Sequence, residues 1–152
     1  DLLQSWADMA SNEGMGSVGK EAARWLIGPR SFRRILPALG SIGPLQLFNP
    51  ANAFVSQVQA ILTTDDRSLN ADLGNIECPT MVVVGNQDIL TPRGDAEEIA
   101  SLIPTAELVI ISGGAHGLHI EHATTFNRIL LEFLGRAEKV YVPHGHAAAV
   151  AV

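Results

Sequence analysis

The 152-residue chain has a single cysteine, few charged residues and an excess of acidic over basic side chains. One cysteine excludes an internal disulfide framework and a metal site built from cysteines alone. Sixteen Asp and Glu against ten Lys and Arg give a net charge of −6 at pH 7. Because a nucleic-acid surface needs clustered positive charge, we expect no nucleic-acid partner.

Long hydrophobic runs are also missing. No apolar stretch approaches the roughly 20 residues that a membrane-spanning helix needs, so we expect no membrane partner. The first residues, DLLQSW, lack the basic start and apolar core of a secretory signal peptide, which favours a cytoplasmic location. The hydrophobic share of 47% is typical of a folded domain and excludes a disordered chain.

Residues 1–75 show helical patterns and no strand pattern. Apolar residues recur at helical spacing within residues 6–10, 22–26 and 51–62. A further helix is predicted from Ser31 onward. We therefore expect this half of the chain to consist of helices joined by turns.

Residues 76–136 instead alternate between strand and helix. The predicted elements, in chain order, are a strand at 80–84, a helix at 96–103, a strand at 108–111 and a helix at 126–134. The strands are short apolar runs, typical of parallel strands buried on both faces, and Gly135 is expected to end the last helix. This order predicts an α/β unit with a right-handed crossover, followed by a tail over residues 137–152.

Two candidate catalytic side chains follow the predicted strands. Asp88 comes three residues after Gly85, and His116 comes directly after Gly113-Gly114-Ala115. The carboxyl ends of neighbouring parallel strands lie at one edge of a sheet, so we expect the two side chains to meet there. A carboxylate beside an imidazole orients the ring and stabilises its protonated form, as a general base requires. Alone, either residue would be interpreted as an ordinary loop residue.

The sequence around both candidates resembles the α/β-hydrolase family. Residues 76–92, IECPTMVVVGNQDILTP, are similar to that family's acid-bearing strand and loop, with a Pro before the strand, Gly-x-x-Asp, and a Pro four residues after the Asp. Residues 114–121, GAHGLHIE, followed by Phe126-Asn127 and Phe133-Leu134, resemble its histidine loop and last helix. Ala115 and Ala123 depart conservatively from the usual Gly and Pro.

The resemblance implies an α/β fold: the C-terminal portion of a hydrolase sheet, with its last two parallel strands and their helices in residues 76–136. Residues 1–75 would be the helical lid that precedes the acid strand. The family's nucleophile motif, Gly-x-Ser-x-Gly, does not occur in this sequence, and neither does the oxyanion loop. We therefore expect a split or cleaved hydrolase, produced by proteolytic processing. Its partner in a heterodimer would be an N-terminal chain that carries the nucleophilic Ser and the oxyanion loop.

The implied reaction is hydrolysis of a small-molecule ester, lactone or thioester by a Ser-His-Asp triad. His116 would be its base and Asp88 its acid, with no cofactor and no metal. Two alternatives stay open. The same fold supports acyl transfer, C–C bond hydrolysis, and cofactor-free haloperoxidase or oxygenase chemistry. The chain could also be a non-catalytic binding partner that lacks the nucleophile.

Several nearby residues allow other interpretations. The three-residue spacing of His116, His119 and His122 suggests a metal site, but Gly117 interrupts the helix that such a site would need. Glu121 is interpreted as a residue at the start of a helix. Cys78, which precedes a strand, is interpreted as a packed, inert thiol. Some of the apolar lid residues are expected to line the substrate cavity.

Overall fold

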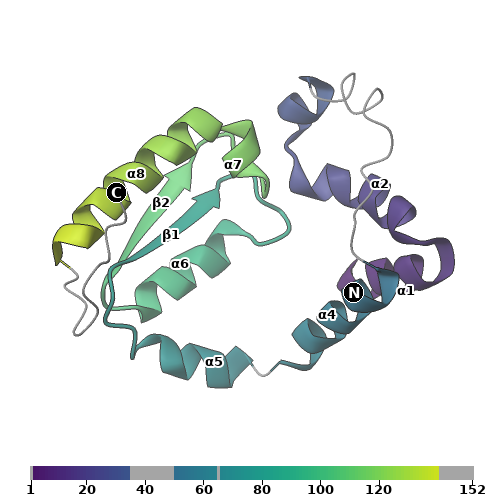
Figure 1. Ribbon diagram of the computed structural model, residues 1–152, viewed down its shortest axis with the longest axis horizontal. Coiled ribbons are helices and arrows are strands. Elements are labelled where there is room, and N and C mark those ends of the chain that lie inside the picture. The colour runs from purple at the N-terminus through teal and green to yellow at the C-terminus, as the bar shows by residue number, and fades with distance from the viewer. Residues whose placement is uncertain (1, 35–49, 65, 141–152) are drawn as a thin grey trace, which may run out of the picture.

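The computed structural model describes residues 2–34, 50–64 and 66–140 (Figure 1). The helices are α1 (Leu2–Glu13), α2 (Met15–Leu26), α4 (Ala51–Thr63), α5 (Asp66–Leu73), α6 (Arg93–Leu102), α7 (Leu118–Glu121) and α8 (Ala123–Val140), and the strands are β1 (Thr80–Gly85) and β2 (Ala106–Ile111). Residues 29–34 are helical as well. The predicted helix is therefore present, but it begins at residue 29 and not at Ser31. Its continuation lies outside the described residues.

Helices α2 and α4 both pack against α1, and together they form what we call the helical region, residues 2–34 and 50–64 (Figure 1). Its core joins Trp6 and Ala10 of α1 to Val18 and Ala22 of α2, and each is at most 7% exposed. Each pair is spaced four residues apart, so each lies on one face of its helix. The small alanine side chains let the helices approach closely.

The sheet consists of β1 and β2, paired in parallel from Thr80 opposite Ala106 to Gly85 opposite Ile111. Helix α6 connects the strands and packs against both, and Figure 1 shows the sheet lying between α6 and α8. The two predicted strands and the α/β fold class are confirmed. Strand β2 begins two residues earlier than expected, at Ala106.

The strands are less buried than their apolar sequences predicted. Within the described residues, burial is complete only at their carboxyl ends, at Val84, Gly85 and Ile111. Ile110 of β2 remains 36% exposed. The expected burial on both faces is therefore not reached within the described part of the chain. The physical reason is that a two-stranded sheet with one helix along each face is covered only in part.

The last helix also differs from the prediction. Helix α8 passes through Gly135 and ends at Val140, so the expected end at Gly135 is wrong. A glycine inside a helix costs only about 1 kcal/mol relative to alanine, and the helix continues through this one. The first four residues of the predicted tail thus lie in α8, and the others lie outside the described residues. None of the described helices is both long and apolar enough to cross a membrane.

Candidate active site

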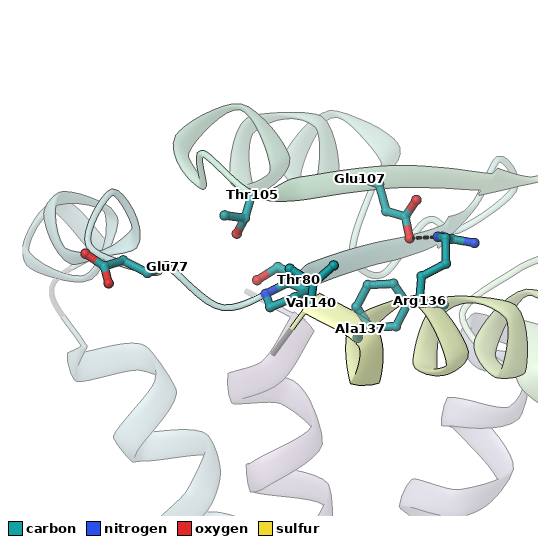
Figure 2. Close-up of a pocket in the computed structure, with 9 residues that line it drawn as sticks. Glu77, Thr80, Thr105, Glu107, Arg136, Ala137 and Val140 are labelled. Atoms are coloured by element: carbon teal, nitrogen blue, oxygen red, sulfur yellow. Dashed lines mark hydrogen bonds and ion pairs between the residues drawn. The ribbon is translucent and has the colours of Figure 1, made fainter. Parts of the chain in front are cut away.

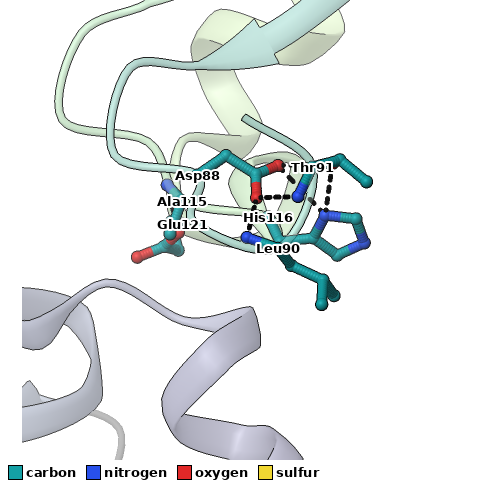
Figure 3. A network of polar contacts seen from close by, with 6 residues as sticks. All are labelled: Asp88, Leu90, Thr91, Ala115, His116 and Glu121. Carbon is teal, nitrogen blue, oxygen red and sulfur yellow. Dashed lines mark hydrogen bonds and ion pairs between the residues drawn. The ribbon is translucent and has the colours of Figure 1, made fainter. Parts of the chain in front are cut away.

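The loops that follow the two strands bring the predicted catalytic residues together (Figure 3). Asp88 lies in the loop after β1, residues 86–92, which we call the acid loop. His116 lies in the loop after β2, residues 112–117, which we call the histidine loop. The His116 Nδ1 atom is 3.0 Å from Asp88 Oδ2. The expected meeting of these side chains at one edge of the sheet is therefore observed.

Hydrogen bonds join the two loops beyond the strand ends. The Gln87 N–H donates to the Gly114 carbonyl at 2.8 Å, and the Gly113 N–H donates to Asn86 Oδ1 at 2.7 Å. A Cβ atom on Gly85 would lie only 2.1 Å from the Gly114 carbonyl oxygen. Because that neighbour is backbone, glycine at position 85 is required for the loops to come this close.

Asp88 is a buried carboxylate surrounded by donors, and its side chain is only 4% exposed. The backbone N–H groups of Leu90 and Thr91 donate to Oδ1 at 2.9 and 3.0 Å, and the Thr91 hydroxyl donates to Oδ2 at 3.0 Å. Burial alone would raise the pKa of Asp88, but the hydrogen bonds from Thr91, His116 and Leu90 outweigh it and lower the pKa below its ordinary value. Asp88 is therefore ionised at neutral pH.

The ionised carboxylate determines which nitrogen of His116 carries the proton. A carboxylate only accepts hydrogen bonds, so the Nδ1 that faces it must be the donor. The Thr91 hydroxyl oxygen lies 3.1 Å from the same Nδ1, so Thr91 contacts both Asp88 and His116. With the proton on Nδ1, Nε2 is the nitrogen that can accept a second proton, and the side chain is 37% exposed. Such a ring can accept a proton from a hydroxyl group that comes within hydrogen-bond distance of Nε2.

Thr91 was not singled out from the sequence. Its position three residues after Asp88 could have indicated a backbone hydrogen bond to that carboxylate. Asp side chains commonly accept hydrogen bonds from backbone N–H groups two and three residues ahead. The contact of its hydroxyl with His116 had no local signal, since it crosses 25 residues of sequence.

Glu121 also has a role that the sequence did not reveal. It lies in the single turn of α7, just before α8, and its carboxylate accepts two backbone hydrogen bonds. The Ala115 N–H donates to Oε2 at 2.9 Å, and the Gly28 N–H donates to Oε1 at 2.9 Å. Glu121 therefore connects the histidine loop to the helical region.

A pocket of about 440 Å³ lies between the end of α2 and the two loops. Its lining residues are Arg24, Trp25, Ile27, Gly28, Pro29, Gln87, Ile89 and Ala115. Gln87 and Ile89 flank Asp88, and Ala115 precedes His116, so the pocket adjoins the Asp88–His116 pair. Among the aromatic residues of the helical region, Trp25 lines this pocket, whereas Trp6 belongs to the helical core.

A second pocket of about 380 Å³ lies elsewhere (Figure 2). It adjoins Thr80 and Thr105, near the amino ends of the strands, and Figure 2 shows the Arg136–Glu107 ion pair at its border. The Asp88–His116 pair lies beyond the carboxyl ends of the same strands. This pocket is therefore separate from the candidate active site.

The remaining candidates are dispersed. Across residues 2–34, 50–64 and 66–140, no three His, Cys, Asp or Glu side chains are placed to hold a metal ion. His119 is exposed and meets the ring of Phe126 edge-on, with ring centroids 6.2 Å apart. Cys78 is exposed, so its interpretation as a packed thiol is wrong. Cys78 lies in the segment before β1, which begins at Thr80, and its side chain is not covered by other described residues.

Comparison with known proteins identifies the family. The sequence profile described as "alpha/beta hydrolase fold" matches residues 48–123, half of the chain. The putative carbamate hydrolase RutD of Stutzerimonas stutzeri is 30% identical over 87 residues, which cover 57% of this chain and 32% of that protein. The chain thus spans about a third of this curated relative's length.

Solved structures agree on the fold. The enol-lactonase from Burkholderia xenovorans LB400 superposes with a TM-score of 0.77 at 22% identity, covering 88% of this chain and 50% of that one. A thermophilic esterase from Thermogutta terrifontis gives a TM-score of 0.75 at 23% identity, covering 89% and 49%. On the profile match and this shared fold, the chain belongs to the α/β-hydrolase fold family.

Proposed function

We propose that this chain supplies the acid and the general base of a Ser-His-Asp hydrolase that cleaves a small-molecule ester, lactone or thioester. The observation that carries the proposal is the buried, ionised Asp88 held against His116 Nδ1 at 3.0 Å, which directs Nε2 to the proton-transfer role. The kinship with proteins named as a carbamate hydrolase, an enol-lactonase and an esterase supports acyl hydrolysis.

In the proposed reaction, His116 Nε2 takes the proton of a serine hydroxyl as the serine oxygen attacks the substrate carbonyl. The imidazolium then returns the proton to the leaving oxygen or sulfur, and the acyl group stays on the serine. A water molecule attacks this acyl-enzyme with His116 again as base. The imidazolium then returns the proton to the serine oxygen as the carboxylic acid product leaves. Asp88 stays ionised throughout and stabilises the imidazolium.

The nucleophile has to come from residues outside this sequence, because the sequence contains no Gly-x-Ser-x-Gly motif. We propose that an N-terminal segment carries the serine and the oxyanion loop. The proposal is supported by the neighbours, of which this chain covers about half, and by the partly exposed faces of the described two-stranded sheet. The expected heterodimer, formed by proteolytic processing, is one way to supply this segment.

The pocket beside the pair suits a substrate with an apolar portion. Trp25, Ile27 and Ile89 offer apolar surface, whereas Arg24 and Gln87 offer donors at the border. The helical region would then act as the lid that closes over the substrate. Carbamates are a second candidate class of substrate, favoured by the 30% identity with the carbamate hydrolase relative. Their carbonyl group would be attacked by the same serine, with Asp88 and His116 in the same roles.

The test is labelling of the protein, as isolated from its natural source, with a fluorophosphonate probe, followed by intact-mass analysis of the denatured sample. We expect one labelled serine, outside this sequence, in a Gly-x-Ser-x-Gly motif. A labelled second polypeptide would support the heterodimer, and a label on a longer single chain would refute it. A folded protein with no labelled serine would favour the non-catalytic binding partner.

A panel of p-nitrophenyl esters, lactones, thioesters and carbamates then identifies the substrate class. Turnover of one class above the others, lost together with probe labelling, would support the hydrolase. Acyl transfer to an alcohol in preference to water would favour the acyltransferase alternative.

A further inference from the structure

The helical region and the histidine loop are joined at one compact junction. The Gly117 N–H donates to the Leu26 carbonyl at 2.6 Å. Two residues after Leu26, the Gly28 N–H donates to the Glu121 carboxylate at 2.9 Å. The other carboxylate oxygen of Glu121 accepts the Ala115 N–H at 2.9 Å. One side chain thus fastens two backbone segments that are far apart in the sequence.

Both residues held by Glu121, Gly28 and Ala115, are buried and lie beside the candidate site. Ala115 is 3% exposed and immediately precedes His116, so its hydrogen bond fixes the peptide that carries the imidazole. Gly28 and Ala115 both line the pocket beside the Asp88–His116 pair. A shift of the Glu121 carboxylate would therefore move the base and one wall of the pocket together.

The junction is closely packed, and it has little space for a side chain at either of its glycines. A Cβ atom on Gly28 would lie 3.1 Å from Glu121 Oε1 and 3.6 Å from the Ala115 Cβ. A Cβ atom on Gly117 would lie 2.9 Å from the Leu26 carbonyl oxygen. The segments around Gly28 and Gly117 therefore lie so close together that a side chain at either glycine would crowd its neighbours.

We propose that Glu121 is a positioning residue that sets the orientation of His116 relative to both Asp88 and the pocket. It acts through the backbone of Ala115 and Gly28 and does not itself take part in the reaction. Its effect on turnover rests on the proposed function, whereas its effect on the His116 ring does not. A residue with a merely structural role would lower stability without altering the His116–Asp88 contact.

The experiment compares Glu121→Gln and Glu121→Ala in the intact protein. Glutamine keeps one acceptor oxygen and presents an NH₂ group to the other N–H, so it should be intermediate. Glu97→Ala is the matched control, because Glu97 pairs with Arg93 on the exposed face of α6. Circular dichroism establishes that each variant is folded, and if the alanine variant does not fold, the glutamine variant decides.

The first readout needs no activity. The His116 Nδ1 proton, assigned in ¹H–¹⁵N spectra by its loss in His116→Asn, should broaden or shift strongly in Glu121→Ala, less in Glu121→Gln, and not in Glu97→Ala. The second readout is kinetic. Misplacing a catalytic group by about 1 Å can cost roughly 10²-fold, so we expect about a 10²-fold fall in kcat/KM, with kcat and KM both changed.

An unchanged Nδ1 resonance in folded Glu121 variants would overturn the proposal, whatever happens to their melting temperature. If the wild-type protein hydrolyses none of the substrate classes, the proposed function fails. The resonance would still decide whether Glu121 positions His116.

Discussion

The helical region and the α/β unit of this chain are stabilised in different ways. In the helical region, apolar side chains from α1 and α2 meet in a core, and Trp6 is only 6% exposed. In the α/β unit, helix α8 has no buried residue, and its Leu131 and Leu134 are 68% and 45% exposed. The α/β unit contains the candidate site and has buried apolar residues elsewhere: Val84, Ala96, Ile103, Ile111, Ala115 and Leu118.

The comparison shows that the candidate site lies at the buried strand ends of a unit whose last helix stays exposed, and that hydrogen bonds fix the catalytic groups there. Asp88 is held by donors within three residues of itself and by His116. The acid loop also reaches across to the better-packed region, because Leu90 packs against the helical core. The position of the Asp88–His116 pair thus depends on both regions.

The largest effect is expected from removing the base. Substituting His116→Ala should lower kcat/KM by about 10⁴-fold, because loss of a triad member removes proton transfer in both half-reactions. Steady-state kinetics on the substrate identified by the panel measures it, with exposed His119→Ala as the control. A residual rate above about a tenth of the wild-type rate would contradict the assignment.

The next effect tests the helical core. Substituting Trp6→Ala should lower the free energy of unfolding by about 3–5 kcal/mol, because it leaves a cavity among Ala10, Val18 and Ala22. Urea unfolding followed by circular dichroism measures the change. A loss of less than about 1 kcal/mol would mean that the helical core does not unfold cooperatively with the rest of the protein.

A smaller effect is expected from acid. Because the folded pKa of Asp88 is lowered, its contribution to stability is fully present above the unfolded pKa, about 4, and is lost as pH falls through the lower folded value. Urea unfolding at a series of pH values should show this loss in the wild type and not in Asp88→Asn. Exposed Asp8→Asn is the control and should keep the wild-type acid dependence.

The smallest effect sharpens the comparison between the regions. Substituting Leu131→Ser on α8 should change the free energy of unfolding by no more than about 0.5 kcal/mol, because this leucine is 68% exposed. A loss of several times that amount in the intact protein would show that another segment covers this face of α8. The α/β unit would then have a core that it shares with that segment.

Local patterns in the sequence were enough to predict the strands at 80–84 and 108–111 and the residues that follow them. Short apolar runs ended by glycine report strand ends directly, and the carboxyl ends of parallel strands lie at one edge. The meeting of Asp88 and His116 therefore followed from topology alone. The end of α8 did not follow, because one glycine is too weak a signal to stop a helix.

Only the tertiary structure decided how the pair is supported. The Glu121–Gly28 contact spans 93 residues, and the sequence did not show which of the apolar lid residues, Trp25 among them, would line a pocket. Hydrophobic periodicity says which face of an element is buried, but not which distant segment buries it. Contacts between elements depend on how the elements pack. The roles of Glu121 and Trp25 therefore follow only from the packing of the helical region against the two loops.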